Sequence, residues 1–154
     1  GATGSDLRLD NFPVVCFRFK TDATLTNSRY FIGLVSSQPG NNDTPNTVST
    51  ILLRYSTSVP DSGWVVYSSN GTSGTATSQV LAIAANQAYT LILRATTSSN
   101  VEVWLGTTEA DMALVTTVTS TLPGAAPIGC RATRDFTEKR ASHLANAPHF
   151  TCSS

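Results

Sequence analysis

Charged residues are scarce in this 154-residue chain. Asp, Glu, Lys and Arg make up 13% of it, about half the share of an ordinary soluble domain, and the 10 acidic and 10 basic side chains cancel. The basic residues are scattered along the sequence, so the chain lacks the clustered positive charge that nucleic-acid binding requires. We therefore expect no nucleic acid among its partners.

Long apolar runs are also missing. No stretch approaches the roughly 20 apolar residues that a membrane-spanning helix needs, and no charged start followed by an apolar segment marks a secretory signal. The sequence therefore predicts no membrane insertion. It predicts a single domain over residues 1–154, long enough to bury its own core, in which residues 1–5 have the composition of a vector-derived remnant.

Metal-site spacing is absent as well. The three cysteines, Cys16, Cys130 and Cys152, form no CxxC motif, and His143 and His149 have no neighbouring carboxylate. We expect no metal and no cofactor. The cysteines are compatible with three structural thiols or with one disulfide and one thiol left over, because pairing depends on Cα separations that spacing does not reveal.

Catalytic motifs are equally scarce. The string Gly71-Thr72-Ser73-Gly74 lacks the spacing of a nucleophile elbow, and no glycine-rich loop opens a helix to hold a phosphate. Of the acidic residues only Glu102 lies inside a clear strand pattern, so paired carboxylates would have to come from loops, for example Asp61 with Asp111. We expect no enzymatic activity and no catalytic residues.

What the chain does contain is short alternating segments separated by Gly, Pro, Asn and Ser. Residues 14–20 place Val15, Phe17 and Phe19 on one face, as in a half-buried strand. Similar patterns cover residues 30–35, 50–55, 64–67, 79–84, 89–95, 101–105 and 114–121. This spacing predicts an all-β antiparallel sandwich or barrel.

The remaining segments carry weaker signals. Residues 36–47 form a long turn-rich loop, residues 107–112 are typical of one helical turn, and the charged residues 131–140 suggest a solvated loop. Residues 143–152 would supply the last strand, at a sheet edge because Pro148 cannot donate to a ladder.

The clearest turn is Asn70-Gly71, between a strand that starts at Trp64 and the segment 75–77. Alternation puts Trp64 and Tyr67 on opposite faces, so one of these aromatics should point away from the core. An exposed aromatic can stack on a sugar ring or fill a partner's pocket, although aromatics on strands are more often core. The candidate ligand-binding residues are Trp64, Tyr67, Asn70, Arg54 and Trp104.

Four stretches together resemble one family. They are Phe17 to Lys20 followed by Ser28 to Leu34; Trp64 to Tyr67 with Asn70-Gly71 and residues 74–77; Ala88 to Ala95; and Thr121-Leu122-Pro123 with the segment ending near Phe150. In this order they are similar to the lectin-like jelly-roll domains of bacteriophage tail fibres, tailspikes and other virion proteins. Pro148 and Cys152 depart from the usual pattern of the last strand.

The resemblance implies a two-sheet concanavalin-like β-sandwich, commonly a homotrimer, on the surface of the phage particle. It implies a non-enzymatic module that binds a host-surface glycan or protein receptor, or contributes to fibre assembly. Two alternatives are a structural capsid or fibre decoration or trimerisation unit, and a carbohydrate-binding module of a secreted hydrolase. Binding to host cells or glycans separates the first reading from the structural one, and the sequence upstream of residue 1 separates it from the third.

Overall fold

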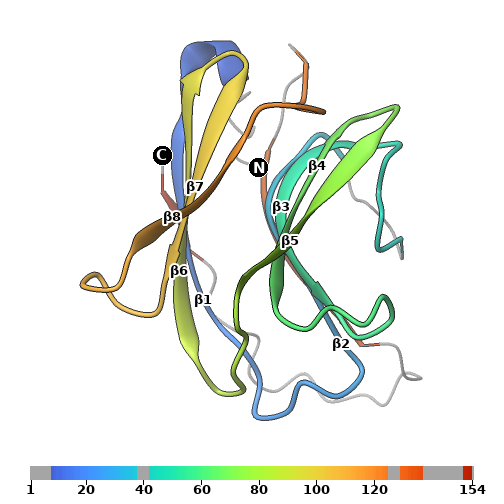
Figure 1. Ribbon diagram of the computed structural model, residues 1–154, viewed down its shortest axis with the longest axis vertical. Helices are drawn as coiled ribbons and strands as arrows, with labels where there is room; N and C mark the ends of the chain where they lie inside the picture. The colour runs from blue at the N-terminus through green and yellow to red at the C-terminus, as the bar shows by residue number, and fades with distance from the viewer. Residues whose placement is uncertain (1–7, 38–41, 125–128, 137–150, 154) are drawn as a thin grey trace, which may run out of the picture.

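The chain forms a sandwich of two antiparallel β-sheets, as expected (Figure 1). The computed structural model describes residues 8–37, 42–124, 129–136 and 151–153. After a 3₁₀ turn, Leu9–Asn11, the strands are β1 (Val14–Lys20), β2 (Ser28–Val35), β3 (Ser49–Ser56), β4 (Trp64–Asn70), β5 (Gly74–Leu81), β6 (Ala88–Thr97), β7 (Asn100–Gly106), β8 (Ala113–Val118), β9 (Gly129–Phe136) and β10 (Thr151–Ser153).

We name each sheet by its central strand. The β6 sheet has the order β10-β1-β6-β7-β8 and the β3 sheet has the order β5-β4-β3-β2-β9. The chain changes sheet after β1, β5, β8 and β9, so every sheet contains strands that are distant in sequence. This arrangement gives each sheet an inner face, packed on the other sheet, and an outer face.

Aromatic side chains fill the space between the sheets. Trp64, at the start of β4, is fully buried. Its ring lies 5.4–6.1 Å, centroid to centroid, from four others: Phe19, Tyr30, Tyr55 and Tyr89. The indole N–H of Trp64 has no hydrogen-bond acceptor among the described residues, so this side chain contributes to stability through packing alone.

Gly33 allows β2 and β3 to lie close together. Its φ is 154°, and a side chain there would meet the carbonyl oxygen of Ile51 on β3. Only glycine therefore fits this position without displacing backbone.

Several segments differ from the sequence-based expectation. Residues 131–136 are not a loop but belong to β9, which pairs with β2 from Ser28↔Phe136 to Val35↔Gly129. The pairing satisfies backbone groups of β2 that would otherwise form an open edge, and charged residues are common on such edge strands. Of the expected last strand only β10 falls within the described residues, and residues 137–150, including both histidines, lie outside them.

Two strand boundaries differ from the expectation, and the structure shows the bonding state of two cysteines. The segments 75–77 and 79–81 belong to one strand, β5, which ends at Leu81 rather than at residue 84, and its pairing with β4 has two register shifts. Strand β8 ends at Val118 rather than at residue 121. Cys130 is disulfide-bonded and Cys16 is a free thiol, which selects the alternative of one disulfide with one thiol left over. No helix in the described residues is long and apolar enough to cross a membrane.

The expected helical turn at residues 107–112 is instead a turn organised by one carboxylate. Asp111 accepts hydrogen bonds from the hydroxyls of Thr107 and Thr108 and from the backbone N–H of Thr108. These bonds satisfy the local donors without a helical backbone, which is how Asp and Thr stabilise turns. The Thr107 bond is the main reason that the pKa of Asp111 falls from 3.8 to about 2.

Replacing Trp64 tests the packing of the core. We expect Trp64→Ala to lower the free energy of unfolding by about 3–5 kcal/mol, because the cavity would lie among four rings. Trp64→Phe should cost clearly less, since it keeps a ring and removes the unsatisfied N–H. Urea unfolding measures both, and a Trp64→Ala variant within about 1 kcal/mol of the parent would contradict this account of the core.

An NMR titration of the Asp111 side-chain carboxyl measures its pKa and so tests the hydrogen bonds of this turn. Its depressed pKa means that the turn's contribution to stability is fully present above pH 3.8 and is lost as the pH falls through about 2. Thr107→Val should move the pKa of Asp111 back toward 3.8, and Thr108→Val should move it less. A pKa that stays near 2 in Thr107→Val would show that the hydroxyl is not the main cause.

Candidate functional site

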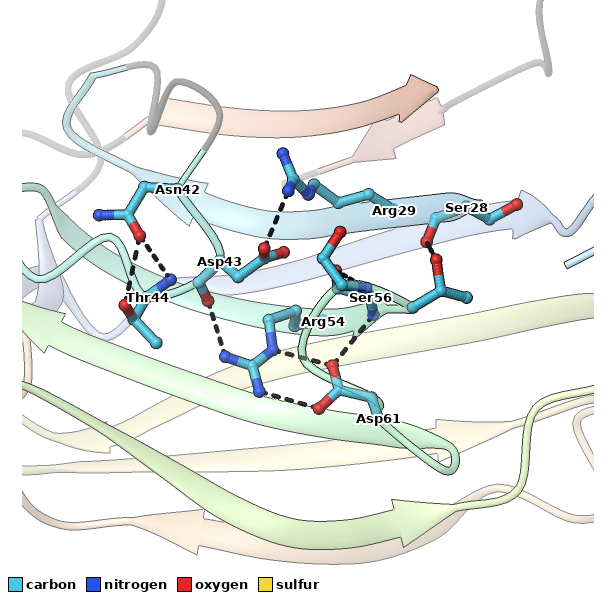
Figure 2. Close-up of polar contacts among 10 residues, drawn as sticks. Ser28, Arg29, Asn42, Asp43, Thr44, Arg54, Ser56 and Asp61 are labelled. Atoms are coloured by element: carbon cyan, nitrogen blue, oxygen red, sulfur yellow. Dashed lines mark hydrogen bonds and ion pairs between the residues drawn. The ribbon is translucent and has the colours of Figure 1, made fainter. Parts of the chain in front are cut away.

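The outer face of the β3 sheet is closed by the protein's own chain. Outward-pointing side chains on β2 and β3 include Phe31, Leu52 and two arginines, Arg29 and Arg54, and all four residues are at most 6% exposed. The loop between β2 and β3 and the loop between β3 and β4 supply the carboxylates that meet these arginines (Figure 2).

Two Arg–Asp pairs hold these loops down. Arg29 Nη2 lies 2.8 Å from Asp43 Oδ2. Arg54 donates from Nε and Nη2 to the two carboxylate oxygens of Asp61, at 3.0 and 2.9 Å, and from Nη1 to the backbone carbonyl of Asp43 at 2.7 Å. The side chains of Arg54 and Asp61 are each 6% exposed. A bidentate pair at this depth fixes geometry as well as charge.

The role of this network is structural: it holds the two loops on the sheet. We call the pairs Arg29–Asp43 and Arg54–Asp61 the Arg–Asp clasp. Asp61 Oδ2 also accepts the backbone N–H of Ser56, so Asp61 ties the β3–β4 loop to β3 through both Arg54 and Ser56. The hydroxyl of Ser69 donates to the carbonyl of Asn46, which adds a contact between β4 and the β2–β3 loop. The guanidinium of Arg54 is already used by Asp61 and by the Asp43 carbonyl, which leaves little of it for a ligand.

Three of the five candidate residues from the sequence are buried. Trp64 has no exposed surface, Tyr67 is 3% exposed and Arg54 is 5% exposed. Tyr67 does point away from the core, as expected, but it lies beneath the guanidinium of Arg54, 5.6 Å from its ring centroid, and against Gly74. Burial raises the pKa of Tyr67 above its usual value of 10.0. These positions give no support to contact with a ligand from solvent.

Asn70 is exposed, but its side chain has a structural role in the β4–β5 turn. Its side-chain oxygen accepts the backbone N–H groups of Thr72 and Ser73 and so holds the β4–β5 turn. This is a common use of Asn in a tight turn. Asn70 also lies on the β3 sheet, whereas the fifth candidate, Trp104, lies on the outer face of the β6 sheet, so the structure does not bring the candidates together as one site.

Within the described residues, the outer face of the β6 sheet is open around Trp104. The strand registers place four partly exposed or exposed side chains side by side across four strands: Cys16, Ile92, Trp104 and Leu114. We call them the Trp104 row. At a strand spacing of about 4.8 Å the row is roughly 15 Å long. The row is apolar and contains no charged residue.

A polar pair borders this row on one side. Trp104 Nε1 donates to Glu102 Oε2 at 3.1 Å, and Arg94 Nη1 lies 3.8 Å from the same carboxylate oxygen. The hydrogen bond orients the indole, and the Arg94 side chain is 57% exposed and that of Glu102 is 24% exposed. Both can therefore offer hydrogen bonds to a molecule lying on the indole, Glu102 as an acceptor and Arg94 as a donor.

Exposed apolar side chains also mark this face. Leu114, at one end of the row, is 46% exposed, and Val14, which pairs with Arg94 on the same face, is 51% exposed. Clustered apolar surface with a polar border is typical of a surface that binds another molecule. The outer face around Trp104 is thus the best candidate site in the described residues.

Sequence reasoning named Trp104 but not its neighbours. The hairpin of residues 89–95 and 101–105 is enough to predict two of these contacts. If Ala95 pairs with Val101, Ile92 lies beside Trp104 and Arg94 lies beside Glu102. The contributions of Cys16 and Leu114 depend on which strands flank that hairpin, and alternation alone does not give this order.

Among the described residues, no group of three or more His, Cys, Asp or Glu side chains is arranged to hold a metal ion. No protein-family model, curated protein or solved structure matches the chain.

The Arg–Asp clasp makes a testable contribution to stability. Asp61→Ala should lower the free energy of unfolding by about 3–5 kcal/mol, because it leaves the Arg54 guanidinium buried without its carboxylate. Glu109→Ala, which breaks the exposed Arg18–Glu109 pair, is the matched control and should leave the stability almost unchanged. Denaturant unfolding of both variants checks this, and equal effects would show that burial of the clasp does not matter.

Proposed function

We propose that this chain is a non-enzymatic surface module of a bacteriophage virion that binds a glycan of the host surface through the Trp104 row. The observation that carries the binding role is the partly exposed indole of Trp104, held in place by Glu102 on an otherwise open sheet face. The phage context rests on the resemblance of the four stretches described above to lectin-like virion domains.

The chemistry of the face suits a sugar ring. A pyranose has an apolar face of C–H groups that stacks on an indole, and hydroxyls at its rim that need donors and acceptors. Glu102 and Arg94 stand beside the indole and supply one of each. Their charges compensate each other, which favours an uncharged sugar over a strongly acidic one.

A single such site binds weakly, because a sugar buries little surface and leaves much of its hydration in place. Several copies on one particle would multiply the affinity through effective concentration. A virion module can therefore work with a shallow face and needs no deep pocket.

A second candidate is a structural role in fibre or capsid assembly. The exposed side chains of Val14 and Leu114 favour it, since large apolar groups on an open face are also typical of contacts between proteins. In this reading the occupant of the face is another virion protein.

The test is binding of the isolated domain to host cells and to a glycan array. Trp104→Ala should weaken binding by about tenfold or more, which corresponds to about 1.4 kcal/mol, while Trp104→Phe should retain part of the stacking. Lys20→Ala, at the far end of the same face, is the matched control and should bind like the parent.

Unchanged affinity of Trp104→Ala for a glycan that the parent binds would contradict the proposed site. Absence of any glycan or cell binding by the folded parent, together with capture of another protein of the same virion, would replace the proposed function with the structural one.

A further inference from the structure

Strand β8 is an open edge of the β6 sheet. It pairs with β7 on one side, and no backbone hydrogen bond on its other side is found within the described residues. Its six residues, Ala113–Val118, contain no charge and no proline. Charged side chains and prolines are the usual devices that stop an edge strand from pairing with another chain.

The faces of the β8 side chains follow a symmetric pattern. Ala113 and Val118 pair with the inward-facing Leu105 and Val101, whereas Leu114 and Thr117 pair with the outward-facing Trp104 and Glu102. A register shift between these pairs leaves Val115 and Thr116 both on the inner side, Val115 packed against the core and Thr116 opposite Val103. The order is therefore in, out, in, in, out, in, which reads the same in both directions.

We infer that β8 pairs with β8 of a second copy of this chain across a two-fold axis. In the antiparallel register centred between residues 115 and 116, Ala113 meets Val118, Leu114 meets Thr117 and Val115 meets Thr116 of the other copy. Every pair then joins side chains of the same face over the full strand, which is the condition for a continuous sheet. The two β6 sheets become one sheet of twice the width.

Three further observations favour a second copy as the occupant. Leu114, 46% exposed in the single chain, would be covered by its neighbours in the joined sheet. Strand β5, the corresponding edge of the β3 sheet, lies near β8 and is also free of charge and proline, so the contact can extend over both layers of the sandwich. The chain's formal net charge of zero adds no repulsion between identical copies.

This pairing goes beyond the proposed function and does not depend on it. If the Trp104 row binds a glycan, the dimer would present two rows on one continuous face, each ending at Leu114 beside the axis. A two-fold dimer also differs from the trimer that the family resemblance implies, so the oligomeric state separates the two.

Sedimentation equilibrium or light scattering of the purified chain at tens of micromolar tests the proposal. The expected mass is twice that of the 16.3 kDa chain. Thr116→Lys should give a folded monomer, because this inward-facing side chain can reach water past the open edge of a single chain but would be buried beside Val115 of the partner in the joined sheet. Thr96→Lys on β6 should remain a dimer. A monomeric or trimeric parent, or a folded Thr116→Lys variant that stays dimeric, would overturn the proposal.

A crosslink tests the register itself. In a Cys16→Ser background, the double variant Leu114→Cys, Thr117→Cys should form a covalent dimer on mild oxidation, because these positions face each other across the axis. Within one strand the two positions are about 10 Å apart, too far for a disulfide. A folded variant that stays monomeric on a non-reducing gel would overturn the register.

Discussion

The bidentate ion pair between Arg54 and Asp61 determines which outer face of the sandwich is accessible to other molecules. Together with the Arg29–Asp43 pair, it fastens two loops over the outer face of the β3 sheet, and these loops form a third layer on that face. Burying two arginines is costly unless each charge is matched, which requires the loops to adopt one arrangement. The other outer face has no such cover in the described residues, and its exposed apolar and hydrogen-bonding side chains lie around Trp104.

The two tryptophans illustrate the resulting asymmetry. Trp64 starts β4 and faces inward, where it is surrounded by rings and its N–H finds no acceptor among the described residues. Trp104 lies on β7 and faces outward, where its N–H is bound by Glu102. Buried aromatics stabilise the sandwich, whereas the outward one offers an oriented apolar surface beside a donor and an acceptor. The same residue type thus serves the core in one sheet and a surface in the other.

Local alternation allowed much of the fold to be predicted. The strand at Val14–Lys20 and the hairpin around Trp104 follow from period-two patterns and turn residues. The number and spacing of the strands predict an antiparallel sandwich or barrel, and the choice of a two-sheet sandwich came from the family resemblance. The clasp could not be predicted, because Arg54 meets Asp43 and Asp61 only after two loops fold back over the sheet. For the same reason the sequence ranked Tyr67 and Arg54 with Trp104, whereas it ranked Trp64 with them because alternation does not show which of two opposite faces is the core. Charge in residues 131–136 suggested a loop, although an edge strand accommodates charge equally well.

The most direct test of this asymmetry is NMR of the two indole N–H groups and the arginine side chains in the presence of a soluble paramagnetic gadolinium chelate. The account predicts strong broadening of the Trp104 indole and of the Arg94 guanidinium, with Trp64, Arg29 and Arg54 protected. Equal broadening of Arg54 and Arg94 would contradict it, because the outer face of the β3 sheet would then be as open as that of the β6 sheet.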